Sequence, residues 1–92
     1  MSELRRQITI VNQRGLHARA SAKFVGAVAA LSDETKVRVA KDGNEAAGGS
    51  ILGLMMLGAA KGDTIELIVG GENAEDAFTQ LGAMIEDGFG EE

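Results

Sequence analysis

The chain lacks cysteine entirely and has a single histidine, His17. Without thiolates it cannot form a disulfide, a thiolate zinc site or an iron–sulfur cluster, and one imidazole offers little to a transition metal. We therefore expect no metal and no cofactor. A composition without cysteine also fits the reducing cytoplasm.

Long apolar runs are missing as well. No stretch approaches the roughly 18 apolar residues expected of a membrane span. Residues 1–6 lead into a strand pattern rather than the apolar core of a signal peptide. We expect a cytoplasmic protein that does not associate with membranes. At 92 residues it should form one domain, residues 1–92, with a core but no roomy cavity, and act on or through another protein.

Basic residues are absent from the C-terminal third. All nine Lys and Arg lie in residues 1–61 with five acidic residues, whereas residues 62–92 carry nine acidic residues. The acidic pI of 4.8, and the lack of a basic cluster interleaved with aromatics, argue against nucleic-acid binding. Arg14, Arg19 and Lys23 lie around His17. They form either a solvated surface or part of a site.

Hydrophobic periodicity predicts four strands and three helices. The Asp42-Gly43 pair favours a hairpin. Ser50 and Asn73 are candidate N-caps for the second and third helices. The tail, residues 88–92, should be frayed because acidic residues oppose the helix dipole there. The predicted strands are 4–11, 35–40, 45–47 and 63–69, and the predicted helices are 18–31, 51–57 and 74–87.

This βαββαβα order predicts an α+β fold. Amphipathic helices and short strands form two layers, with three helices on one face of a four-stranded, largely antiparallel sheet. The other face stays exposed, so the architecture is an open-faced sandwich.

His17 should lie at or just before the N-terminus of the first helix, beside unpaired backbone N–H groups. Imidazole is nucleophilic when neutral, and Arg19 supplies a forked cation suited to phosphate oxygens. The pair suggests a phosphoryl acceptor. Alternatively, a lone histidine in this position only caps the helix or lies on the surface.

Two motifs resemble those of HPr, the histidine-containing phosphocarrier family of the bacterial phosphotransferase system. They are Gly15-Leu16-His17-Ala18-Arg19 and the run from Gly49 to Gly58. The resemblance implies that His17 accepts a phosphoryl group, derived from phosphoenolpyruvate, from enzyme I and passes it to an enzyme IIA-type protein. It further implies that Nδ1 carries the phosphoryl group and that Arg19 stabilises it. Such a carrier is not an enzyme, and we expect a monomer.

The resemblance also gives roles to the second motif. Ser50 matches a serine that an ATP-dependent HPr kinase/phosphorylase modifies in some bacteria, although a plain N-cap is an equal alternative. A seven-residue helix cannot bury every side, so some of its apolar side chains should be exposed. The resemblance implies that Ile51, Leu52 and Met55 form the apolar patch on which enzyme I docks.

One position departs from the family pattern. Ala20 stands where the family usually has proline, which predicts a slightly less rigid first turn but a competent site. Two other functions stay open. One is a regulatory protein-binding module of a nitrogen-type phosphotransferase branch that is not coupled to sugar import. The other is an unrelated α+β domain without phosphotransfer.

Overall fold

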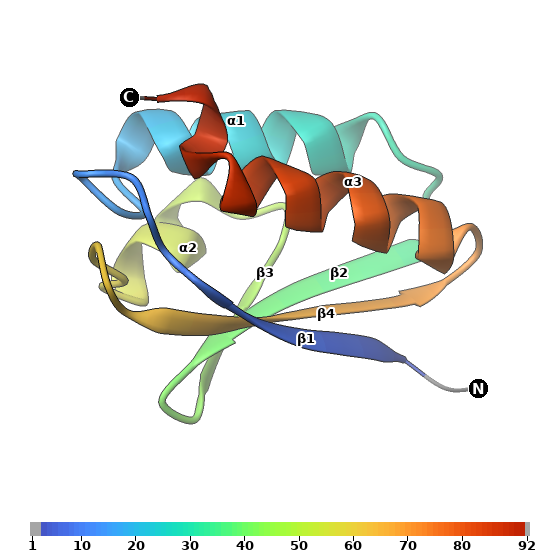
Figure 1. Ribbon diagram of the computed structural model, residues 1–92. Helices are drawn as coiled ribbons and strands as arrows, with labels where there is room; N and C mark the ends of the chain where they lie inside the picture. The colour runs from blue at the N-terminus through green and yellow to red at the C-terminus, as the bar shows by residue number, and fades with distance from the viewer. Residues whose placement is uncertain (1–2, 92) are drawn as a thin grey trace.

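The computed structural model describes residues 3–91, and its elements follow the predicted order (Figure 1). Most boundaries agree closely with the prediction, although β1 and α1 each end slightly earlier. The strands are β1 (Leu4–Thr9), β2 (Thr35–Lys41), β3 (Asn44–Ala47) and β4 (Thr64–Gly71). The helices are α1 (Ala18–Ala29), α2 (Ile51–Met56) and α3 (Ala74–Glu86), followed by the 3₁₀ turn η1 (Gly88–Gly90).

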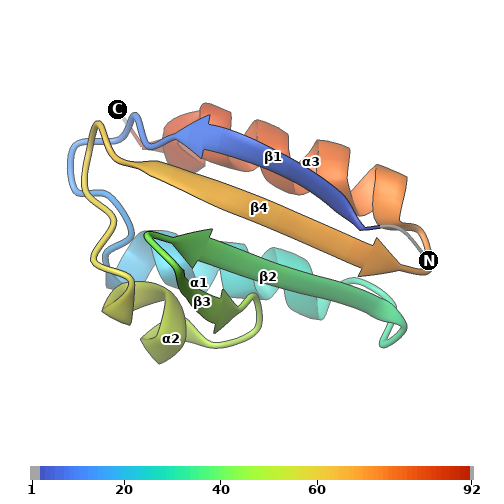
Figure 2. The same ribbon diagram turned by 90° about the horizontal axis from the view of Figure 1, so that it is seen from below.

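The sheet has the strand order β1-β4-β2-β3, and every neighbouring pair is antiparallel. Helices α1 and α3 lie side by side over one face, and the opposite face is bare (Figures 1 and 2). The short helix α2 lies beside β3 and packs against α1. The predicted α+β open-faced sandwich is confirmed.

The core lies between the sheet and the helices. Alternation along β4 turns Ile65, Leu67 and Val69 toward the helices, and all three are buried. Phe24 of α1 and Leu81 of α3 are buried in the same cluster. The amphipathic helices and the alternating strand therefore bury the faces that their sequence periods predict.

The open face also buries one apolar side chain. Ile68 points away from the helices, yet only 1% of it is exposed. Its sheet neighbours are Arg5 on β1 and Arg38 on β2. Long arginine side chains can cover apolar surface with their aliphatic stems while their charged ends stay in water. The flanking arginines thus explain how an isoleucine is buried on the solvent side of the sheet.

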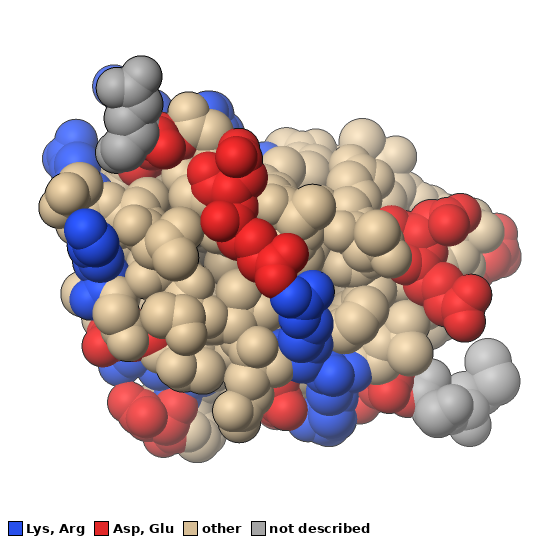
Figure 3. All heavy atoms as spheres, viewed as in Figure 1, with Lys and Arg blue, Asp and Glu red and all other residues tan. Residues whose placement is uncertain are grey.

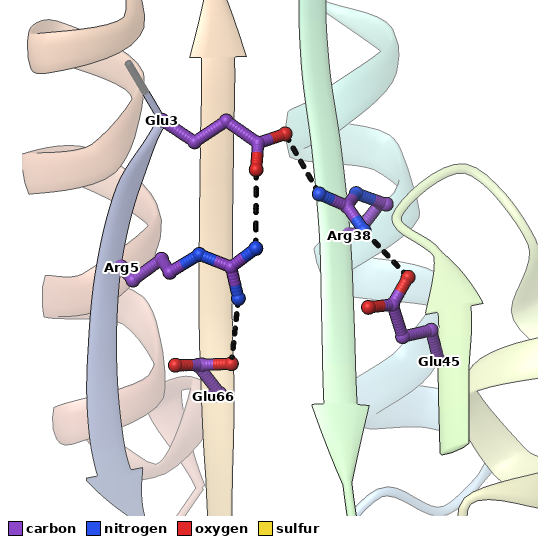
Figure 4. Close-up of polar contacts among 5 residues, drawn as sticks. All are labelled: Glu3, Arg5, Arg38, Glu45 and Glu66. Carbon is purple, nitrogen blue, oxygen red and sulfur yellow. Dashed lines mark hydrogen bonds and ion pairs between the residues drawn. The ribbon is translucent and has the colours of Figure 1, made fainter. Parts of the chain in front are cut away.

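Ion pairs join the charged groups of this face (Figure 4). The Glu3 carboxylate contacts Arg38 at 2.7 Å and Arg5 at 3.2 Å. Arg38 also pairs with Glu45 at 2.6 Å, and Arg5 with Glu66 at 3.1 Å. The hydrogen bond from Arg38, assisted by Arg5, lowers the pKa of Glu3. Such exposed pairs contribute little individually to stability, but together they involve residues of all four strands.

The C-terminal segment corrects one prediction. Residues 88–91 are not frayed, because Phe89 is buried with 2% exposure against the core that includes Leu16, Phe24 and Ile85. Burying a phenylalanine side chain contributes about 1.5–3 kcal/mol. An unfavourable charge at a helix end costs only about 0.3–1 kcal/mol. The hydrophobic term therefore outweighs the dipole. Glu92, which the prediction also included, lies outside the described residues.

Asn73 corrects a second prediction. It precedes α3 but its side chain makes no capping hydrogen bond, and its backbone is left-handed at φ 56°. An N-cap side chain normally acts from an extended backbone. Asparagine tolerates the left-handed region better than most residues, so it suits the sharp turn between β4 and α3 instead.

Candidate functional site

A tight turn delivers His17 to the start of α1. Gly15 has φ +61°, and a Cβ atom there would collide with the Ala59 carbonyl oxygen. The same carbonyl accepts a 2.9 Å hydrogen bond from the Leu16 backbone N–H. Only glycine meets both demands without strain, since it has no Cβ and populates positive φ readily. The glycine before the histidine therefore fixes how the chain enters the helix.

His17 is the N-cap of α1, as predicted. Its backbone is extended at φ −80° and ψ −178°, and its side-chain Nδ1 accepts a 3.2 Å hydrogen bond from the Arg19 backbone N–H. The side chain is largely buried, with 15% of it exposed. Nδ1 thus faces the first backbone amides of α1, which have no hydrogen-bond partner within the helix. They lie at the positive end of the helix dipole, an environment that favours an anion.

The other ring nitrogen contacts a carboxylate. His17 Nε2 lies 2.6 Å from Oε2 of Glu91. Because Nδ1 accepts a hydrogen bond, the neutral ring that satisfies both contacts carries its proton on Nε2 and donates it to Glu91. This tautomer leaves the lone pair on Nδ1. Sequence reasoning missed Glu91 because it treated the tail as frayed.

Asn12 holds Glu91 in place. Its Nδ2 donates to Glu91 Oε1 at 3.0 Å and to the Gly15 carbonyl at 2.9 Å. Asn12 is 3% exposed, and its Oδ1 is buried without a hydrogen-bond partner among residues 3–91. The bond from Asn12, then the contact with His17, lowers the pKa of Glu91 against the opposing effect of burial, with a smaller contribution from Lys23. Glu91 is therefore a carboxylate near neutral pH.

The basic residues near His17 separate into two kinds. Lys23 donates from Nζ to the Phe89 carbonyl at 2.8 Å and so ties α1 to η1. Arg14 and Arg19 are exposed, and within the described chain neither guanidinium has a hydrogen bond or an ion pair. The side chain of Arg19 is available at the helix start, as its predicted role requires. Ala20, in the same turn, is fully buried.

Ser50 also caps a helix. Its Oγ accepts a 2.9 Å hydrogen bond from the Gly53 backbone N–H at the start of α2. The N-cap prediction is confirmed. The start of α1 and the whole of α2 lie at the same end of the molecule (Figures 1 and 2).

An exposed apolar patch surrounds this second helix. Only Leu54 of α2 is buried, whereas Ile51 is 40%, Leu52 67% and Met55 40% exposed. The predicted exposure of these three side chains is confirmed. Sequence reasoning missed one further member, because an apolar side chain that stays exposed looks like a core residue in the sequence. It is Met56, which is 77% exposed at the end of α2.

Charge is distributed unevenly over the molecule. Figure 3 shows acidic side chains gathered at both ends of α3, where Glu75, Asp76, Glu86 and Asp87 lie.

Residues 3–91 contain no group of three or more metal-ligating side chains placed to hold an ion. Within the same range, no helix has the length and apolar character needed to cross a membrane.

Sequence comparisons with known proteins match nearly the whole chain to one family. The family model described as "PTS HPr component phosphorylation site" matches residues 4–87. Phosphocarrier protein HPr of Neisseria meningitidis is 44% identical over 88 residues, covering 96% of this chain and 97% of the relative. Phosphocarrier protein NPr of Shewanella violacea is 36% identical over 91 residues, covering 99% of this chain and 98% of the relative.

Among solved structures, the crystal structure of HPr from Thermoanaerobacter tengcongensis is similar to this fold. Its TM-score is 0.87 at 38% sequence identity. The similarity covers 100% of this chain and 99% of that one. The structural similarity therefore includes all four strands and all three α-helices of the open-faced sandwich.

Proposed function

This chain belongs to the HPr family of phosphocarrier proteins, and from that membership we propose that His17 accepts a phosphoryl group from phosphorylated enzyme I and passes it to an enzyme IIA-type protein. Members of this family carry phosphoryl groups and are not catalysts. The observation that carries the proposal is the placement of His17 Nδ1 at the N-terminus of α1, 3.2 Å from a backbone N–H.

The proposed step is a direct transfer between nitrogens. The Nδ1 lone pair attacks the phosphorus of the enzyme I phosphohistidine, and the P–N bond to enzyme I breaks with its electron pair returning to that nitrogen. The backbone amides at the start of α1 and the Arg19 guanidinium would receive the phosphoryl oxygens. The transfer to the IIA-type protein repeats these bond changes in the opposite sense. A carrier needs only moderate stabilisation, because the group must leave again.

The patch around α2 is the proposed docking surface for enzyme I. Ile51, Leu52 and Met55 are exposed beside the start of α1, and apolar patches rimmed by polar residues commonly mark protein interfaces. Ser50 adjoins this patch. We propose that its phosphorylation by an HPr kinase/phosphorylase would weaken docking, since a dianion resists desolvation in an apolar interface.

A nitrogen-type regulatory role is the second candidate, because relatives named HPr and NPr both match nearly the whole chain. The two roles share the His17 chemistry and differ in the acceptor. Phosphorylated protein should therefore be offered separately to a sugar-type and a nitrogen-type IIA protein. Preferential transfer to the nitrogen-type acceptor would favour the regulatory branch.

The central test is incubation with phosphoenolpyruvate and purified enzyme I. The proposal expects one equivalent of acid-labile, alkali-stable phosphate on His17. No label in the presence of active enzyme I from the same organism would refute the proposed function.

A further inference from the structure

A carboxylate from the far end of the chain contacts the nitrogen of His17 that does not cap α1. Glu91 Oε2 lies 2.6 Å from Nε2, although the residues are 74 positions apart. Both side chains are largely buried, with 15% of His17 and 20% of Glu91 exposed. A short contact in a partly desolvated place is stronger than an exposed surface pair.

Three independent anchors set the position of this carboxylate. Phe89 is buried in the core, and Lys23 holds the Phe89 carbonyl at 2.8 Å. Asn12 binds the second Glu91 oxygen at 3.0 Å while also binding the Gly15 carbonyl, so the loop before His17 and the tail are joined. The carboxylate is therefore held in place before any phosphoryl group arrives, and little entropy is lost in ordering it.

We propose that Glu91 is a positioning residue for phosphoryl transfer, which holds the proton of His17 on Nε2 and stabilises the positive ring that forms when Nδ1 is phosphorylated. The inference rests on the proposed function of His17. A carboxylate that orients a histidine and stabilises its imidazolium form has the same role in hydrolytic triads.

The chemistry balances without a proton leaving the site. Before transfer the ring is neutral, with a proton on Nε2 and a lone pair on Nδ1. The new Nδ1–P bond uses that lone pair, so the ring becomes an imidazolium whose proton stays between Nε2 and Glu91. When the phosphoryl group leaves, the electron pair of the Nδ1–P bond returns to Nδ1 and the ring is neutral again. Glu91 thus stabilises the charged ring in both directions.

Opposite charges keep the carboxylate from repelling the phosphoryl group. Glu91 contacts the ring on Nε2, whereas the phosphoryl group bonds to Nδ1, and the imidazolium lies between them. The hydrogen bond from Asn12, with further contributions from His17 and Lys23, lowers the pKa of Glu91, which agrees with a group that stays ionised. A neutral residue in its place would preserve the shape of the tail but not this charge balance.

The first test is proton NMR of the unphosphorylated protein at a pH at which the imidazole is neutral. A hydrogen-bonded Nε2–H proton should give a far-downfield resonance that exchanges slowly with solvent. The Glu91→Gln substitution keeps an acceptor but removes its charge, so the resonance should move upfield. Glu91→Ala removes the acceptor, and the resonance should be lost. Glu75→Gln, a matched change in the first turn of α3, should leave it unaltered.

The second test is the transfer rate from phosphorylated enzyme I. Glu91→Gln and Glu91→Ala should slow turnover by about 10- to 100-fold, a loss of the size found when the carboxylate that orients a metal-ligating histidine is removed. The apparent Michaelis constant should stay unchanged, because the α2 patch is intact. Melting temperatures establish that each variant is folded.

Specific results would overturn the inference. A downfield resonance that persists in Glu91→Ala, or transfer by either variant at the wild-type rate, would show that Glu91 does not act through His17. Faster transfer would show instead that the tail covers the histidine. Failure of enzyme I to label the unmodified protein would refute the proposed function alone, since the NMR experiment needs no phosphorylation and decides the Glu91 contact separately.

Discussion

The starts of α1 and α2 are both capped by a side chain that accepts a backbone hydrogen bond, but their surroundings differ. Each is capped by a side chain that can carry phosphate, His17 through Nδ1 at 3.2 Å and Ser50 through Oγ at 2.9 Å. At α1, the cap is flanked by Arg19 and by the carboxylate of Glu91. At α2, the cap is followed by the exposed apolar side chains of Ile51 and Leu52.

This difference indicates why two anion-favouring helix starts would serve separate purposes. At α1, the charged groups around the imidazole are proposed to stabilise both the free and the phosphorylated ring, so that a phosphoryl group passes through. At α2, a phosphoserine would be a stable ester beside a surface that must lose water to bind a partner. The first place suits a relay and the second suits a switch.

Replacing the α1 cap should have the largest effect. His17→Ala is expected to abolish acid-labile labelling by enzyme I, because it removes the only imidazole, while the core stays intact. The measurement is labelling with radioactive phosphoenolpyruvate. Ser50→Ala serves as the control and should be labelled at the wild-type level. Acid-labile label on His17→Ala would show that His17 is not the phosphoryl acceptor, and the proposed difference in role between His17 and Ser50 would be wrong.

Arg19→Ala should have the next largest effect. Charge-assisted hydrogen bonds contribute about 1.5–3 kcal/mol, so transfer should slow by roughly 10- to 100-fold with little change in melting temperature. Arg14→Ala is a matched control, since Arg14 is also exposed and without an ion pair in residues 3–91. Equal rates for the wild type and Arg19→Ala would deny the arginine a role in holding phosphate.

Ser50→Asp tests the α2 side of the comparison. A negative charge beside Ile51 and Leu52 should raise the apparent Michaelis constant for enzyme I by roughly tenfold, the change that about 1.4 kcal/mol of docking free energy produces. Thermal stability should be preserved, because aspartate is also a good N-cap. If both this variant and authentic phospho-Ser50 protein behave as the wild type does, the serine is only a cap.

Ala20→Pro should have the smallest effect and sharpens the comparison on the α1 side. Ala20 lies in the first turn, where a backbone N–H has no intrahelical partner, so proline removes no helix bond. By restricting the unfolded chain it should add about 0.4–1 kcal/mol to the free energy of unfolding. Chemical denaturation measures this change. A loss of stability would mean that the buried position at Ala20 cannot accept the proline ring.

Much of the fold was predictable from local pattern. The period of β4 and the apolar stripes of α1 and α3 gave the two layers, and Gly15 with His17 gave the helix start, because these features depend on near neighbours in the chain. The exposure of Ile51, Leu52 and Met55 was also predictable, since a helix as short as α2 cannot bury all sides. Ser50 was correctly placed as a cap by its residue type alone.

The sequence by itself determined which residues are proposed to carry the chemistry, His17 with Arg19, because the proposed roles depend on residue type and on a helix start. Only the tertiary structure decided what lies at the other ring nitrogen. Glu91 reaches His17 because Phe89 is buried against the core and Asn12 joins two distant segments. Neither the Glu91 contact nor the ordered tail has a periodic signal, since both arise from packing between residues that local propensity treats independently.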